Sequence, residues 1–161
     1  MQQVFLELAD QLPAPGTIAA PARVGPLDPL PMFDQRRGWF NTEIVSEQQL
    51  SDVSRLRGAY YLSGYLVLLL NWRHEPPSIT RDKARRGLAE EFEHALSTRY
   101  LVVLRASQPD EPPPPGEVFL FDLHSKRLLC QFALRGGEYT GVLLELMNSL
   151  RRATGGTFIL R

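Results

Sequence analysis

Three segments of the chain have the pattern of a helix. Residues 80–98 show it best, because apolar side chains recur there at the three- and four-residue spacings of an amphipathic helix. That stripe consists of Ala84, Leu88, Phe92, Ala95 and Leu96. Residues 47–57 follow Ser46, a residue type that caps helix N-termini, and residues 138–152 form the third segment.

Apolar runs between these segments predict strands at residues 39–45, 59–72 and 100–106. Residues 116–132 predict a β-hairpin, and residues 157–161 predict an edge strand. Helices that lie between and after strands are typical of an α+β fold. We therefore expect a mostly antiparallel sheet of about four to six strands, covered by about three helices.

The predicted hairpin gathers residues that could carry chemistry, so its register matters. A turn at residues 124–127 pairs Leu123 with Leu128, Phe121 with Cys130 and Phe119 with Phe132 on one apolar face. The opposite, mixed face then holds Val118, Leu120, Asp122, His124, Arg127, Leu129, Gln131 and Ala133.

This register predicts no catalytic triad in the hairpin. Alternation of side chains places Cys130 on the face opposite Asp122 and His124, so the three cannot act as nucleophile, base and orienting group. Cys130 is instead expected to be a small buried hydrophobic residue. Asp122 and His124 supply too few ligands for a closed metal site, and we predict no metal and no catalytic residue.

The first 38 residues differ from the rest because proline recurs at positions 13, 15, 21, 26, 29 and 31. We expect residues 1–38 to form an irregular arm, with a short helix at residues 2–11, and residues 39–161 to form a single domain. Leu12, Leu27, Leu30, Met32 and Phe33 make the arm too apolar for a free linker, so it should lie along the domain or a partner.

Composition limits the classes of function. The chain has 161 residues, 43% of them hydrophobic and 22% charged, which is ordinary for a soluble globular protein. Its formal net charge is zero, which argues against a nucleic-acid binder. Sixteen arginines against two lysines resemble the composition that a GC-rich, bacterial-like genome gives.

The number of cysteines and the length of the apolar runs bear on the cellular compartment of the protein. One cysteine allows no internal disulfide, and the longest apolar run, residues 58–72, is too short to cross a bilayer. The first residues show no signal peptide, which predicts a cytoplasmic protein. A secreted or lipid-anchored chain that had been trimmed would look the same.

One charge pattern points to a ligand. Arg81, Lys83, Arg85 and Arg86 crowd the start of the helix predicted at residues 80–98, where the helix macrodipole favours negative charge. A bound phosphate or carboxylate would compensate for this order, whereas a solvated charged face is the simpler interpretation. The chain has neither GxxxxGK[ST] nor GxGxxG, so no nucleotide or other cofactor is predicted.

The sequence thus leaves two hypotheses open. The first is a non-catalytic protein-interaction or assembly module, whose apolar arm binds a protein partner or a second copy of the chain. Its contact residues would be Leu27, Leu30, Met32, Phe33 and, at a strand end, Trp72. The alternative is a small-ligand-binding domain or enzyme that recognises an anion through the four basic residues. The prolines at 112–115 are interpreted as a stiff connection between strands.

Overall fold

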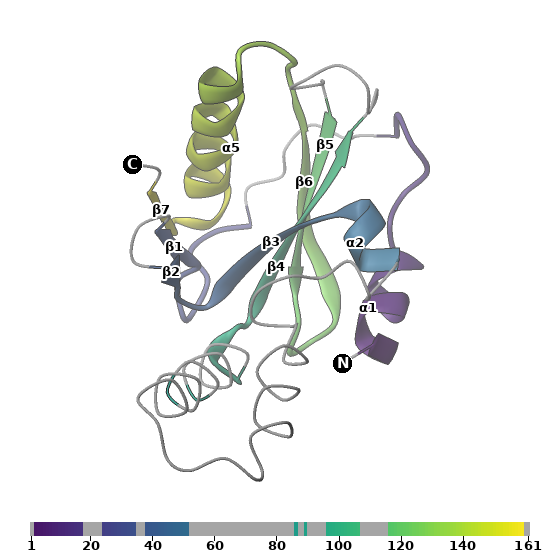
Figure 1. Cartoon of the computed structure of the whole chain (residues 1–161), viewed down its shortest axis with the longest axis vertical. Helices are drawn as coiled ribbons and strands as arrows, with labels where there is room; N and C mark the ends of the chain where they lie inside the picture. Colours follow the sequence, from purple (N-terminus) through teal and green to yellow (C-terminus); the bar gives the residue numbers. More distant parts are fainter. Residues whose placement is uncertain are drawn as a thin grey trace, which may run out of the picture.

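A computed structural model describes residues 2–17, 24–34, 38–51, 86, 89, 96–106 and 116–159 of the chain. These residues form two β-sheets, with helices on both sides of the larger one (Figure 1). The α+β class predicted from the sequence is therefore confirmed. No helix among the described residues is long and apolar enough to cross a membrane.

The larger sheet has four strands in the order β3-β4-β5-β6. They are β3 (Thr42–Ser46), β4 (Tyr100–Ala106), β5 (Gly116–Asp122) and β6 (Arg127–Leu134). β3 runs parallel to β4, and the other two pairs are antiparallel. β4 and β5 are buried along most of their length.

Helix α5 (Tyr139–Thr154) covers what we call the first face of the four-stranded sheet (Figure 1). The helix ends at Gly155, whose φ of 72° suits glycine and whose N–H donates to the carbonyl of Arg151. The buried side chains of this first core cluster are Tyr100, Val102, Val118, Leu120, Cys130, Phe132, Leu134, Leu146, Met147, Leu150, Ala153 and Phe158.

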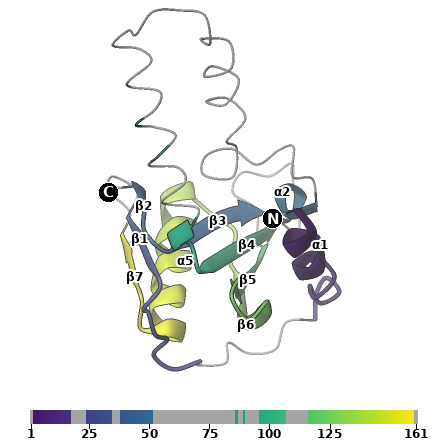
Figure 2. The same ribbon diagram turned by 90° about the horizontal axis from the view of Figure 1, so that it is seen from below.

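Helices α1 (Gln2–Ala9) and α2 (Glu47–Ser51) cover the opposite, second face (Figure 2). Ser46 and Gln49 form a capping box at the start of α2: Gln49 donates its N–H to Ser46 Oγ at 3.2 Å, and Ser46 donates its N–H to Gln49 Oε1 at 2.8 Å. The cap predicted at Ser46 is confirmed. The second core cluster contains Phe5, Leu8, Val45, Leu50, Leu101, Val103, Phe119 and Phe121.

The smaller sheet has three strands in the order β2-β1-β7. They are β1 (Met32–Asp34), β2 (Gly38–Trp39) and β7 (Thr157–Ile159). β1 is antiparallel to β2 and parallel to β7, so the arm pairs with a strand that follows α5. Gly156 permits this pairing, because a Cβ at that position would run into the carbonyl oxygen of Pro31.

The predictions of a helix at residues 2–11 and of another at 138–152 are confirmed as α1 and α5. The single strand predicted at residues 39–45 is wrong, since β2 and β3 belong to different sheets. Asn41 lies between them and explains the break. Its side chain donates to the carbonyl of Leu30 at 3.0 Å and accepts the N–H of Met32 at 2.8 Å, which ties the chain to the arm.

The hairpin register predicted from the sequence is also wrong. The turn comprises residues 123–126, and Phe121 pairs with Leu128, whereas Leu120 pairs with Cys130. A β-bulge inserts Leu129 between these pairs, and one extra residue exchanges the two faces of β6 beyond it. As a result, both faces of the hairpin are apolar, and Leu120 lies in the first core cluster.

Other predicted elements fall largely outside the described residues. The strand predicted at residues 59–72 lies there entirely, as do the prolines at 112–115. Of the described residues within the helix predicted at 80–98, Arg86, Ala89, Leu96 and Ser97 are helical and Thr98 is not. Leu96, which the pattern places on the apolar stripe, is exposed instead.

Candidate functional site

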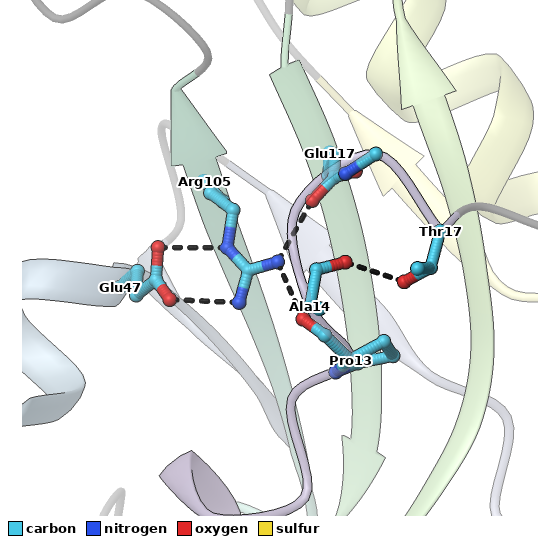
Figure 3. Close-up of polar contacts among 7 residues, drawn as sticks. Pro13, Ala14, Thr17, Glu47, Arg105 and Glu117 are labelled. Carbon is cyan, nitrogen blue, oxygen red and sulfur yellow. Dashed lines mark hydrogen bonds and ion pairs between the residues drawn. The ribbon is translucent and has the colours of Figure 1, made fainter.

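Arg105, near the end of β4, is the centre of a polar network on the second face of the four-stranded sheet (Figure 3). Its Nε and Nη2 atoms each donate to one carboxylate oxygen of Glu47, both at 2.8 Å. Its Nη1 donates to Glu117 Oε2 and to the carbonyl oxygen of Pro13, also at 2.8 Å. The arginine therefore joins α2, β5 and the arm.

The strand register explains why these groups meet. Arg105 and Glu117 are direct partners in the β4–β5 ladder, so their side chains lie on the same face. Glu47 is the first residue of α2, which follows β3, and β3 is the parallel neighbour of β4. The guanidinium also lies over the ring of Phe119, 4.9 Å from its centroid.

The network is largely withdrawn from water. The side chains of Arg105 and Glu117 are only 10% and 8% exposed. The hydrogen bond to Glu47 is the main cause that raises the pKa of Arg105, although burial acts in the opposite direction. Arg105 is therefore charged, and most of its donors are engaged by the protein itself. We call Arg105, Glu47 and Glu117 the arginine clamp.

The clamp holds a tight turn of the arm. Thr17 donates its N–H to the carbonyl of Ala14 at 3.3 Å, and Gly16 has a φ of 79°. Proline followed by a glycine of positive φ is the signature of a type II turn. Gly16 donates its N–H to Glu117 Oε1 at 2.8 Å, so Arg105 and Glu117 together bind both ends of residues 13–16.

Further along, residues 24–34 of the arm pass the end of α5 and join the smaller sheet as β1. Val24 and Leu27 donate backbone N–H groups to the carbonyls of Ala153 and Thr154, at 3.1 and 3.4 Å. Tyr100 donates its hydroxyl to the carbonyl of Pro29 at 2.8 Å. This part of the arm is thus fixed by hydrogen bonds at several points along its length.

The four arm residues proposed as contact residues differ in their surroundings. Leu27 and Phe33 pack partly buried against the first core cluster. Leu30 and Met32 are 43% and 37% exposed, and Pro31 between them is buried. Residues two apart in an extended segment point to the same side, so Leu30 and Met32 share one face.

Exposed residues next to Leu30 and Met32 enlarge the surface that these two side chains form. Pro26 and Leu30 lie next to Gly155, within 3.9 Å of the position where a Cβ on that glycine would be. Thr157 is the register partner of Met32 and is exposed too. We call Leu30 and Met32, with Pro26, Gly155 and Thr157, the arm surface.

The other candidate residues are less informative. Trp72, Arg81, Lys83 and Arg85 lie outside the described residues, so anion binding at the predicted helix stays a prediction. Arg86 is described, is exposed, and takes part in an interaction of its own.

The polar residues of the hairpin form its turn. Asp122 Oδ1 accepts the backbone N–H of His124 at 3.0 Å and the Nε–H of Arg99 at 3.4 Å, while Oδ2 accepts the hydroxyl of Ser125 at 3.0 Å. Burial opposes the charged form of Asp122, but these hydrogen bonds outweigh it and lower the pKa of the carboxyl group.

Cys130 is separated from this turn, but not for the reason inferred from the sequence. The bulge puts Cys130 on the first face, the face on which alternation along β5 also places Asp122, so the predicted separation by faces is wrong. Cys130 is the register partner of Leu120, further along the strand, and burial raises the pKa of its thiol to about 11. The prediction of a small buried hydrophobic residue is confirmed.

Replacing Asp122 with alanine should lower the free energy of unfolding by about 1–3 kcal/mol at neutral pH, because charged hydrogen bonds of the turn are lost. Because the pKa of Asp122 is lower in the folded chain than in the unfolded chain, its charge stabilises the fold at pH values above the unfolded pKa near 4. This stabilisation is lost as the pH falls through the folded pKa. Urea denaturation should thus show a difference between parent and variant that narrows below about pH 4. His124→Ala, at an exposed side chain, is the control with little expected effect.

No group of three or more His, Cys, Asp or Glu side chains that could hold a metal ion occurs among the described residues. Comparisons with protein-family models, with curated proteins and with solved structures found no match. The arginine clamp and the arm surface are therefore the features from which a function can be inferred.

Proposed function

We propose that the chain is a non-catalytic protein-interaction or assembly module and that the arm surface is its contact area. The observation that supports this proposal is the contrast within the arm. Leu27 and Phe33 pack on the first core cluster, whereas Leu30 and Met32 remain exposed on a segment fixed by hydrogen bonds.

The chemistry of the arm surface suits a protein partner. Its defining side chains are uncharged, and charged residues are depleted at the centre of protein interfaces. Methionine adapts its shape to a partner more readily than branched side chains do. Because Asn41 already holds the backbone of Leu30 and Met32, binding would order little additional chain.

Point substitutions test this proposal better than removal of the arm. Deleting residues 1–35 would also remove Phe5, Leu8 and all of β1, so binding and folding would be lost together. The informative variant is Leu30→Asp with Met32→Asp. Leu144→Asp is its control, because Leu144 is an exposed leucine on α5.

We expect the double variant to fold and to lose the association that is made through the arm surface. Sedimentation velocity over a range of concentrations measures self-association, and capture on the immobilised chain followed by mass spectrometry measures partners. Loss of two central apolar contacts should weaken binding by roughly 2 kcal/mol or more. Equal association of the double variant and Leu144→Asp would contradict the proposal, as would a parent chain that binds neither itself nor another protein.

A further inference from the structure

Helix α1 is docked on the second face by two fully buried side chains. Phe5 and Leu8 are spaced three residues apart, so they lie on one side of the helix, and both belong to the second core cluster. The sheet face beneath them is formed by Leu101, Val103, Phe119 and Phe121. A short amphipathic helix that covers an apolar surface through two anchor residues is a common mode of peptide recognition.

The polar contacts between segment 2–17 and the other described residues also resemble those of a bound peptide. Lys126 Nζ lies 2.7 Å from Glu7 Oε2, and Gln11 donates its side-chain amide to the carbonyl of Lys126 at 2.9 Å. The arginine clamp then binds Pro13 and Gly16. Each hydrogen bond that joins segment 2–17 to other described residues has a side chain as donor or acceptor.

Segment 2–17 is therefore bound like a ligand, and it shares no strand ladder with the other residues that the structure describes. Its release would leave both described sheets paired and would expose Phe5, Leu8 and the part of the second face that α1 covers. The occupant that fits the vacated site best is a second copy of the same segment. That copy carries the two apolar anchors, the carboxylate for Lys126, the amide for its carbonyl and the turn for the arginine clamp.

We propose that segment 2–17 exchanges between two copies of the chain, so that each α1 covers the second face of the other copy. Exchange is self-complementary: two chains related by a two-fold axis fill both sites and leave neither face exposed. The contacts given above for segment 2–17 are then made between the two copies. This site lies on the other side of the sheet from α5, so the inference is independent of the arm surface.

Two charge-reversal variants of the full chain test the exchange. Glu7→Lys alone and Lys126→Glu alone each place like charges together, whether α1 docks within its own chain or on a second copy. In a mixture, only exchange between the two variants brings opposite charges together at both sites. One variant is labelled with ¹⁵N, and native mass spectrometry measures the three dimers after incubation below the melting temperature.

In an equal mixture, random pairing gives as much mixed dimer as the two homodimers together. We expect the ratio of mixed dimer to homodimers to rise about fivefold or more above this statistical value at low salt, and this rise to fall at high salt. Glu7→Lys mixed with Arg152→Glu is the matched control, because Arg152 is an exposed residue of α5, and its dimers should be statistical. Circular dichroism verifies that the variants are folded. A statistical mixture would show association through another surface, and a monomer at all concentrations would show none; either result overturns the proposal.

Discussion

Replacing Arg105 with alanine should lower the free energy of unfolding by about 3–5 kcal/mol, because the substitution leaves a buried carboxylate without its counter-charge. Glu117 is only 8% exposed and is paired through Arg105 Nη1 at 2.8 Å. The variant also loses both hydrogen bonds to Glu47 and the bond to the carbonyl of Pro13. Urea denaturation followed by circular dichroism measures the loss.

Arg99→Ala is the matched control for this prediction. Arg99 precedes β4 and is paired with Asp122 at 3.4 Å, but its side chain is considerably more exposed than that of Arg105. Asp122 keeps its hydrogen bonds from His124 and Ser125 when Arg99 is removed, and the Arg99–Asp122 pair is longer and only part-buried, so the control should be destabilised clearly less than Arg105→Ala. If both variants lost the same stability, burial of the arginine clamp would have no energetic consequence and the prediction would be wrong.

A double variant separates the contribution of the Arg105–Glu117 ion pair to stability from the contribution of the bonds that hold the arm. Replacing Arg105 with Met and Glu117 with Leu removes both buried charges, and such exchanges are often neutral or stabilising. The double variant should therefore regain much of the stability that Arg105→Ala loses. It cannot regain the bonds to Pro13 and Gly16, so the Gly16 amide should exchange its hydrogen faster than in the parent.

Sequence patterns predicted the helices and strands that depend mainly on residues close together in the chain. Ser46 caps α2 with its own hydroxyl, and the spacing of apolar residues over 138–152 predicts α5. The apolar run at 100–106 is found as β4, buried on both sides. Each of these features depends on residues within one or two turns or on one short strand.

The arginine clamp could not be predicted in this way, because its members are far apart in the sequence. Arg105 is 58 residues from Glu47 and 92 from Pro13. Two local signals were nevertheless present: one arginine and one glutamate beside long apolar runs in neighbouring strands, and the Pro-Gly pair of a type II turn. Only the register of β4 and β5 shows that these signals belong together.

The hairpin shows how a single residue limits prediction. Pairing strands from the apolar pattern assumes unbroken alternation, and that assumption placed Phe119, Phe121, Cys130 and Phe132 on one face. The bulge at Leu129 breaks the alternation of β6, so Cys130 and Phe132 lie on the opposite face from the two β5 phenylalanines. Nothing in the local sequence marks this bulge, since both faces of the hairpin are apolar.

Replacing Leu120 with alanine distinguishes the two registers. In the structure, Leu120 is fully buried between Val102 of β4 and Cys130 of β6, so the variant should lose about 2–5 kcal/mol through the cavity that it leaves. On the mixed, partly solvated face that the sequence pattern predicts, the same change would have a small effect. Leu144→Ala, at an exposed position of α5, supplies the reference for such a change.

Cys130 provides a second, independent measurement of the same register. Its burial raises the thiol pKa to about 11, so near neutral pH the parent should react slowly with thiol reagents. Because Leu120 is the register partner of Cys130, the cavity left by Leu120→Ala should open beside the thiol and speed the reaction under native conditions. Unchanged stability together with an unchanged rate of labelling would mean that Leu120 does not cover Cys130, and the bulged register would then be wrong.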